Sequence, residues 1–123
     1  MGLNKTPGLA AERLAGKYLR AQGYRVVEER CRTRFGELDL ICRKGREIVF
    51  VEVKSVESEA GFIAEEGVNP NKIEHIVKSA KAWLMKKKLA DLEVRFDVIA
   101  IDLKEEPPLL KHYPAAFESP FDL

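Results

Sequence analysis

The sequence predicts an α/β domain of three layers, in which a central mixed β-sheet carries one helix on each face. Two segments have apolar residues at helical spacing, and the segments between and after them alternate as strands do. The elements follow one another as helix, strand, hairpin, helix, strand and short strand, which suits neither an all-helical nor an all-β fold. We expect one domain over residues 1–123, with an ordered core of about residues 7–115.

The composition is that of a globular protein, with 46% apolar and 33% charged residues. No apolar run approaches the ~20 residues of a membrane helix, and the N-terminus lacks the apolar core of a signal peptide. We therefore expect a cytoplasmic protein without a membrane partner. Cys31 and Cys42 are too few for a four-ligand zinc site. Because the net charge is only +1, any nucleic-acid surface must come from local segregation of charge.

The first helix is predicted to begin at Thr6-Pro7, with Thr as the N-cap and Pro at the first helical position, and to end at Gly23. Glu12 lies at the edge of its apolar stripe. Two interpretations stay open: a carboxylate held by a partner near the core, or a first-turn Glu that favours the helix dipole and reaches solvent. The stripe consists of Ala11, Leu14, Ala15, Tyr18 and Leu19.

A strand is expected over Tyr24–Cys31, and three arginines at alternate positions accompany its end: Arg30, Arg32 and Arg34. In an extended segment, side chains at alternate positions lie on one side. Because Arg is suited to phosphate recognition, this segment is a candidate nucleic-acid contact. An ordinary solvated edge is the other interpretation.

The centre of the predicted sheet is a β-hairpin with arms Glu37–Arg43 and Glu47–Lys54, joined by the turn Lys44-Gly45-Arg46. Alternation along the first arm places Leu38 and Leu40 on one face. The remaining assignments put Glu37, Asp39 and Ile41 on the other face of that arm, Val49, Val51 and Val53 on one face of the second arm, and Ile48, Phe50, Glu52 and Lys54 on its other face.

A symmetric hairpin places Asp39 opposite Glu52 and Glu37 opposite Lys54. Opposed side chains have Cβ atoms roughly 4.5–5.5 Å apart, and like charges at that separation are destabilising. A divalent cation would offset the repulsion between Asp39 and Glu52, because carboxylates, waters and a substrate phosphate are the usual ligands of Mg²⁺. Lys54 points to the same side as Glu52, where it could reach a phosphate or a water.

The segment Ser55–Asn69 is predicted to be a long acidic loop, of a length that is usually functional or disordered, and its acidity would repel a nucleic-acid backbone. A second helix is predicted to start at the cap residue Asn71, with Lys72 at its beginning as a candidate phosphate contact. The run Lys86–Lys88 is more typical of a solvated helix end than of a binding patch. The buried stripe of this helix consists of Ile73, Ile76, Val77, Ala80, Trp83 and Leu84.

Val94–Leu103 is predicted to be a strand inside a covered sheet, because both of its faces become apolar. Leu109–Tyr113 is expected as a short edge strand that stops at Pro114. His75 and His112 are isolated, and each is interpreted as a surface or satisfied histidine rather than a ligand.

Asp39, followed on the hairpin by Glu52-Val53-Lys54, resembles the PD-(D/E)xK nuclease superfamily, and a helical Glu12 ahead of them resembles its Holliday-junction resolvase branch. Over about residues 8 to 115, the chain is similar to the small, uncharacterised bacterial YraN family. The blocks that carry this likeness are Gly8-Leu9-Ala10-Ala11-Glu12, Arg32-Thr33-Arg34-Phe35-Gly36-Glu37-Leu38-Asp39-Leu40-Ile41, Val49-Phe50-Val51-Glu52-Val53-Lys54, Lys72 and Arg95-Phe96-Asp97-Val98. The chain departs from the family at Ser55, where a basic residue is common, and in its acidic loop.

The resemblance implies a nuclease-like domain with a restriction-endonuclease-like fold and a site for Mg²⁺ or Mn²⁺. Asp39 and Glu52 would be metal ligands, with the backbone carbonyl of Val53 as a third. Glu12 would complete the metal site, directly or through a water. Lys54 would orient or activate the attacking water and stabilise the developing charge.

The resemblance also gives roles to the surrounding charges. Glu37 would pair with Lys54 or lie just behind the ligands. Phosphate would be held by Arg32, Arg34 and Lys72. By this analogy the protein is a metal-dependent endonuclease acting on DNA phosphodiesters, in branched or otherwise structured DNA, and a homodimer would suit the two arms of a branched substrate.

Two other functions are compatible with the same residues. The first is a nucleic-acid-binding protein of the same fold that lacks turnover and serves in DNA repair, recombination or RNA processing. The second is a structural protein in which Asp39, Glu52, Lys54 and Glu12 form a buried salt-bridge cluster, so that removing one partner would strongly destabilise the fold.

Overall fold

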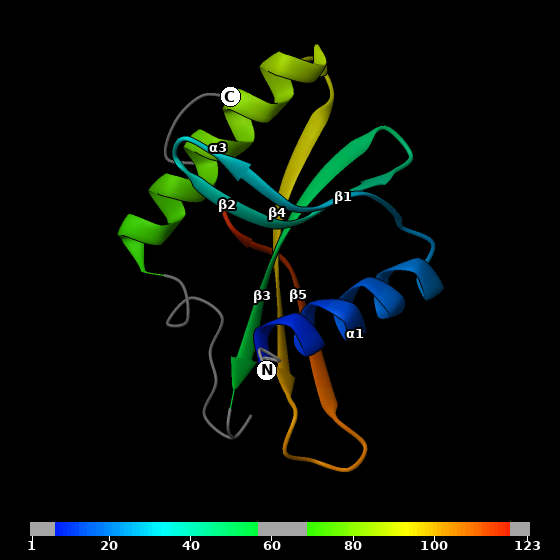
Figure 1. Cartoon of the computed structure of the whole chain (residues 1–123). Coiled ribbons are helices and arrows are strands. Elements are labelled where there is room, and N and C mark those ends of the chain that lie inside the picture. The colour runs from blue at the N-terminus through cyan, green and yellow to red at the C-terminus, as the bar shows by residue number, and fades with distance from the viewer. Residues whose placement is uncertain (1–6, 57–68, 119–123) are drawn as a thin grey trace.

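The computed structural model describes residues 7–56 and 69–118 (Figure 1). Five strands form one sheet in the order β1-β2-β3-β4-β5, in which β3 and β4 are parallel and the other neighbours antiparallel. The helices of the described residues are α1 (Pro7–Ala21) and α3 (Pro70–Lys87), and the strands are β1 (Arg25–Thr33), β2 (Gly36–Lys44), β3 (Glu47–Val56), β4 (Glu93–Asp102) and β5 (Leu109–Phe117). Neither helix is both long and apolar enough to cross a membrane.

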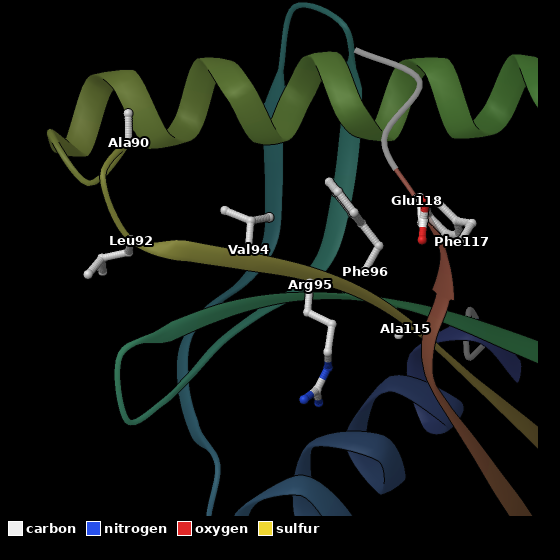
Figure 2. A pocket seen from close by; sticks show the side chains of 8 residues that line it. All are labelled: Ala90, Leu92, Val94, Arg95, Phe96, Ala115, Phe117 and Glu118. Atoms are coloured by element: carbon white, nitrogen blue, oxygen red, sulfur yellow. The ribbon is translucent and has the colours of Figure 1, made fainter. Parts of the chain in front are cut away.

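The two helices cover opposite faces of the sheet (Figure 1), which confirms the predicted α/β/α layers around a mixed sheet. Helix α3 connects β3 to β4 and so forms the crossover that parallel neighbours require. Strand β4 shows how the faces are divided: Val94 and Phe96 point towards α3, and Arg95 between them points to the side of α1 (Figure 2).

Each helix packs on its own apolar core. Along β3, successive residues alternate between the cores as predicted, so that Ile48 and Phe50 lie under α3 and Val49 and Val51 lie under α1. The α1 core consists of Ala11, Ala15, Leu19, Tyr24, Leu40, Cys42, Val49, Val51, Ile99 and Ile101. The α3 core consists of Leu38, Ile41, Ile48, Phe50, Ile76, Val77, Ala80, Trp83, Leu84, Phe96 and Val98. Burial of these side chains is the main force that holds the three layers together.

The elements near the N-terminus lie close to their predicted positions. Helix α1 ends before Gly23, whose φ of 93° is a left-handed conformation that terminates helices. Strand β1 extends two residues beyond the expected Tyr24–Cys31. The predicted cap Thr6 and most of the predicted loop Ser55–Asn69 lie outside the described residues.

The predicted cap of α3 is wrong by two residues. Asn69, not Asn71, is the cap: its side chain accepts a hydrogen bond of 2.9 Å from the backbone N–H of Lys72. Pro70 occupies the start of the helix, where a missing N–H leaves no bond unmade. The pair Asn69-Pro70 was therefore the stronger start signal.

Strand β5 continues through Pro114 to Phe117, so the expected stop at Pro114 is also wrong. The strand lies at the edge of the sheet, and its pairing with β4 is irregular around this proline. Ala115 in the irregular stretch has a φ of 51°. An edge strand with a bulge tolerates Pro, because no neighbouring strand needs its N–H.

Replacing the cap of α3 tests its assignment. We expect Asn69→Ala to lower the free energy of unfolding by about 1 kcal/mol, because it removes the bond to the first turn. Urea denaturation measures this. Asn71→Ala is the matched control and should not lower it, because Asn71 is exposed within the helix and Ala is the better helix former. Equal losses in both variants would contradict the assignment.

Candidate active site

The predicted carboxylates lie where β2 and β3 separate. From the turn to Leu40 opposite Val51, the two strands follow the predicted register. Asp39 and Glu52 would be the next pair, but the ladder of backbone pairs ends before them. Instead, the Asp39 carboxylate accepts a hydrogen bond of 2.9 Å from the backbone N–H of Val53. A side chain of β2 thus satisfies a backbone donor of β3, and both acids gather at the point of separation.

The alternation of β2 breaks at Asp39. Leu38 packs in the α3 core and Leu40 in the α1 core, so the prediction that they share a face is wrong. Arg30 lies beside this point on β1 and has a φ of 51°, a left-handed conformation that regular strands exclude. This irregular backbone, which the sequence pattern does not reveal, allows successive stretches of β2 to present different faces.

Asp39, which is partly buried, and Glu52, which is buried, form a close pair of acids. Glu52 is 8% exposed, and the two carboxyl groups share a hydrogen bond. Burial, followed by the repulsion from Asp39, raises the pKa of Glu52 to about 7. Burial also raises the pKa of Asp39 above its ordinary value, although the N–H of Val53 partly opposes this. The pair therefore holds a proton near neutral pH when no cation compensates it.

Glu12 reaches the same region from α1, so the structure favours a partnered carboxylate over one that extends into solvent. Its side chain is 17% exposed, and its Oε1 lies 3.7 Å from Arg30 Nη1. The same oxygen is buried and has no hydrogen-bond partner among the described residues. Burial and then the charge of Asp39 raise the pKa of Glu12. Such an orphaned oxygen is suited to a bound ion or its water.

The lysines near Asp39 and Glu52 differ in their contacts. Lys72 Nζ lies 3.3 Å from Glu52 Oε2, so Lys72 already compensates a carboxylate. Lys54 is partly buried on β3, and no ion pair of its side chain is found within residues 7–56 and 69–118. Glu37 lies opposite Arg32 in the ladder between β1 and β2, and no contact between Glu37 and Lys54 is seen in the described structure.

The three arginines do not line one side of an extended segment, contrary to expectation. Arg30 has a left-handed backbone and pairs with Glu12. Arg32 is exposed on β1. Arg34 lies in the turn after β1, with its guanidinium 5.0 Å from the centre of the Phe35 ring. The strand ends at Thr33, which is why the alternation does not reach Arg34.

The donor set fits a hard divalent cation. In the described part of the chain, no three His, Cys, Asp or Glu side chains already converge on one metal position. Mg²⁺ does not require this, because it usually keeps several waters and binds through one or two carboxylates plus substrate phosphate. Asp39 and Glu52 supply two carboxylates, and Glu12 offers an oxygen that pairs with Arg30 at 3.7 Å but has no hydrogen-bond partner among the described residues. The backbone carbonyl of Val53 stays a prediction as a ligand.

A separate hollow lies away from these residues, beside the start of β4 and the end of β5 (Figure 2). Its volume is about 440 Å³, and none of the predicted site residues lines it. Arg95 lines it in part, but its guanidinium is held on the side of α1 by Asp97 at 2.8 Å and Glu47 at 3.2 Å. Arg95 is the charged residue that β4 contributes to the lining, and its guanidinium points away from the hollow.

Sequence reasoning missed a second buried acid, Asp97, which is fully enclosed on the side of α1. Arg95, the Ala115 N–H and His112 all bond its carboxylate, the last at 2.7 Å, and His112 also bonds Tyr18 at 3.0 Å. Burial would raise the pKa of Asp97, but these bonds outweigh it and hold the pKa below its ordinary value. His112 is thus a satisfied histidine, as interpreted. The position of Asp97 between apolar residues of β4 was the available signal.

Comparison with known proteins gives one consistent result. A family model described as uncharacterised protein family UPF0102 matches residues 11–101. The chain is 40% identical over 116 residues to a UPF0102 protein of Geobacter sulfurreducens, which covers 94% of this chain and 91% of the relative. It is 41% identical over 118 residues to one of Syntrophus aciditrophicus, with coverage of 96% and 93%. The expected likeness to an uncharacterised bacterial family is confirmed.

The raised pKa of Glu52 makes stability depend on pH. The folded state holds an extra proton, so this stabilisation is complete below the unfolded pKa of 4.5 and is lost as pH rises through about 7. Glu52→Gln removes the effect. Between these pH values, the free energy of unfolding of the variant should gain up to ~3 kcal/mol relative to the wild type. Urea denaturation in EDTA measures it, and the exposed Glu93→Gln should show no such trend.

The negative charge of Asp97 should stabilise the fold, unlike the charges of Asp39 and Glu52. Asp97→Asn leaves Arg95 and His112 around a neutral amide, and we expect a loss on the order of 3 kcal/mol in the free energy of unfolding at neutral pH. Asp39→Asn should cause no comparable loss, because it removes a repulsion. Thermal and urea unfolding of both variants would check this contrast. A large loss from Asp39→Asn would favour the salt-bridge cluster instead.

Proposed function

The chain belongs to the uncharacterised protein family UPF0102, and from this premise we propose that it is a metal-dependent phosphodiesterase of endonuclease type acting on DNA. Asp39 and Glu52 would hold Mg²⁺ or Mn²⁺. The observation that carries this proposal is the pair itself: a buried and a partly buried carboxyl group, both with raised pKa values, at a break in the sheet. Such perturbed groups are typical of sites that bind or react.

The repulsion within the pair explains why a cation would bind. Without one, burial of two like charges is unfavourable, and a proton or Lys72 has to compensate. A divalent ion would take the place of the proton and of the Lys72 ammonium. The two carboxyl groups are already close together, so the ion would bind without a large rearrangement of the fold. Glu12, with its orphaned Oε1, would hold a water beside the ion.

When bound, the ion would supply charge stabilisation at the phosphate and a lowered pKa for an attacking water. Lys54 follows Glu52 by two residues on β3, so both start from the same side of the strand. From there its ammonium would orient the water and stabilise the charge that develops on the phosphate. Lys72 would turn from Glu52 to a substrate phosphate, and Arg32 and Arg34 would hold phosphates further along the strand.

A nucleic-acid-binding protein without turnover is the second candidate. One observation favours it: Lys72 already forms an ion pair with Glu52 at 3.3 Å, so part of the charge that a cation would compensate is compensated within the chain. The two candidates differ in metal binding and in cleavage. The structural interpretation is less favoured, because the carboxylates destabilise one another rather than form complete salt bridges.

Metal binding is the first test. Isothermal calorimetry should show that Mn²⁺ and Mg²⁺ bind the wild type and Asp91→Asn alike, because Asp91 is exposed and outside the site. Asp39→Asn should weaken binding at least about tenfold, since one ligand is lost. If the metals bind neither the wild type alone nor the wild type with a non-cleavable DNA junction, the proposed site is wrong.

Cleavage is the second test. Lys54→Met should leave metal affinity within about twofold and lower the cleavage rate of branched or single-stranded DNA by roughly 10²–10³, because the lysine acts on water and charge rather than on the ion. Lys111→Met, an exposed change on β5, is the control. Metal binding without cleavage of either DNA would favour the silent binding protein.

A further inference from the structure

A groove lies between α3 and the turn that joins β1 to β2. Its volume is about 290 Å³, and it is lined by Arg34, Phe35, Lys78, Lys81, Ala82 and Met85. The lining has two kinds of group: an apolar floor that includes an aromatic ring, and cations around it. Met85 is 64% exposed, which is unusual for a large apolar side chain on a helix that also packs a core.

The turn is fixed on α3, so the groove is a built feature. A hydrogen bond of 2.8 Å joins the hydroxyls of Thr33 and Ser79, which lie 46 positions apart in the chain. The backbone N–H of Phe35 donates to the same Thr33 oxygen at 3.0 Å. Gly36 follows with a φ of 140°, a conformation that L side chains rarely adopt. The position of the Phe35 ring over α3 therefore depends on these specific contacts.

The charge around the groove suits a polyanion. Arg34 lies 5.0 Å from the centre of the Phe35 ring. Lys78 forms an ion pair with Glu74 at 3.0 Å, whereas Lys81 is exposed on the same helix. A smaller neighbouring hollow of about 160 Å³ extends the basic surface with Arg32, Lys86 and Lys87. Glu28 also lines this smaller hollow, and the bond of 2.8 Å that it accepts from Trp83 lowers its pKa, so its negative charge offsets part of the positive charge there.

An aromatic ring among cations is typical of proteins that bind single-stranded nucleic acid. Each base has a face that can stack on an aromatic ring, and the phosphates bind Arg and Lys. In a duplex the bases are already stacked and paired, so Phe35 would have no free base to contact. The groove is therefore expected to favour single strands, whose bases are free to stack on Phe35, over duplexes.

The groove and the carboxylates lie at a fixed separation along two elements. From Lys72, which contacts Glu52, to Lys81 there are nine residues of α3, a rise of about 13 Å. From Phe35 to Asp39 there are four residues of β2, which also span about 13 Å.

We propose that the groove binds an unpaired nucleotide, with its base on Phe35 and its flanking phosphates on Arg34 and Lys81, and so gives the protein a preference for strands with unpaired bases. The inference rests on the proposed function for its substrate class, but binding at the groove does not require the metal. It places the scissile phosphate at the carboxylates, about 13 Å along the protein from the bound base.

Fluorescence anisotropy in EDTA tests the groove without cleavage. Labelled oligothymidylate, oligouridylate and a DNA duplex of equal length would be titrated with the full chain. The single strand that binds more tightly identifies the natural sugar, and either supports the proposal provided that it binds more tightly than the duplex. Phe35→Leu keeps apolar volume but removes the stacking face, so it should weaken single-strand binding roughly five- to fiftyfold.

Two controls separate this proposal from the metal site and from folding. Phe35→Leu should bind Mn²⁺ as the wild type does and keep its circular dichroism spectrum. Lys81→Ala should weaken single-strand binding, whereas Lys111→Ala, an equal loss of charge on β5, should change it less than about twofold. If folded Phe35→Leu binds single strands like the wild type, or if the duplex binds more tightly, the inference is overturned whatever the metal site does.

Discussion

The structure depends on one electrostatic constraint, the placing of Asp39 and Glu52 together at a site with little access to water. Nothing in the apolar packing requires these acids, and the sheet gives up regular pairing between β2 and β3 to accommodate them. Because the ladder ends here, the Val53 N–H has no partner on the β2 backbone and donates to the Asp39 carboxylate instead. The same hydrogen bond thus satisfies the backbone and positions Asp39. The separation of β2 from β3 is therefore part of the site.

Acids at two places in the sheet differ in how their charge is compensated. On the side of α1, Asp97 has bonds from a guanidinium, a histidine and a backbone N–H, which together hold its charge. At the break in the sheet, repulsion and burial dominate, and Lys72 offsets them only in part. A complete network stabilises a fold, whereas an incomplete one has capacity for a ligand.

Most of the fold could be predicted from the sequence, because the helix and strand periodicities and the turn residues all agreed with one three-layer arrangement. The register of the hairpin followed from a symmetric turn, and it predicted that Asp39 lies opposite Glu52. The different faces of Leu38 and Leu40 could not be predicted, because they accompany a left-handed backbone at Arg30 on a neighbouring strand. Nor could two of the partners of Asp97 be predicted, because His112 and the Ala115 N–H come from another strand, β5.

The proline in β5 has a consequence for assembly. The sheet has two edges, and an edge with free backbone groups is a template for pairing with another chain. At one edge, Pro114 removes a donor and the left-handed Ala115 bends the strand. At the other, β1 carries exposed charges of both signs, including Arg25 and Glu29. Both edges thus resist extension of the sheet, so two copies of this chain would meet through other surfaces and aggregation by strand addition is disfavoured.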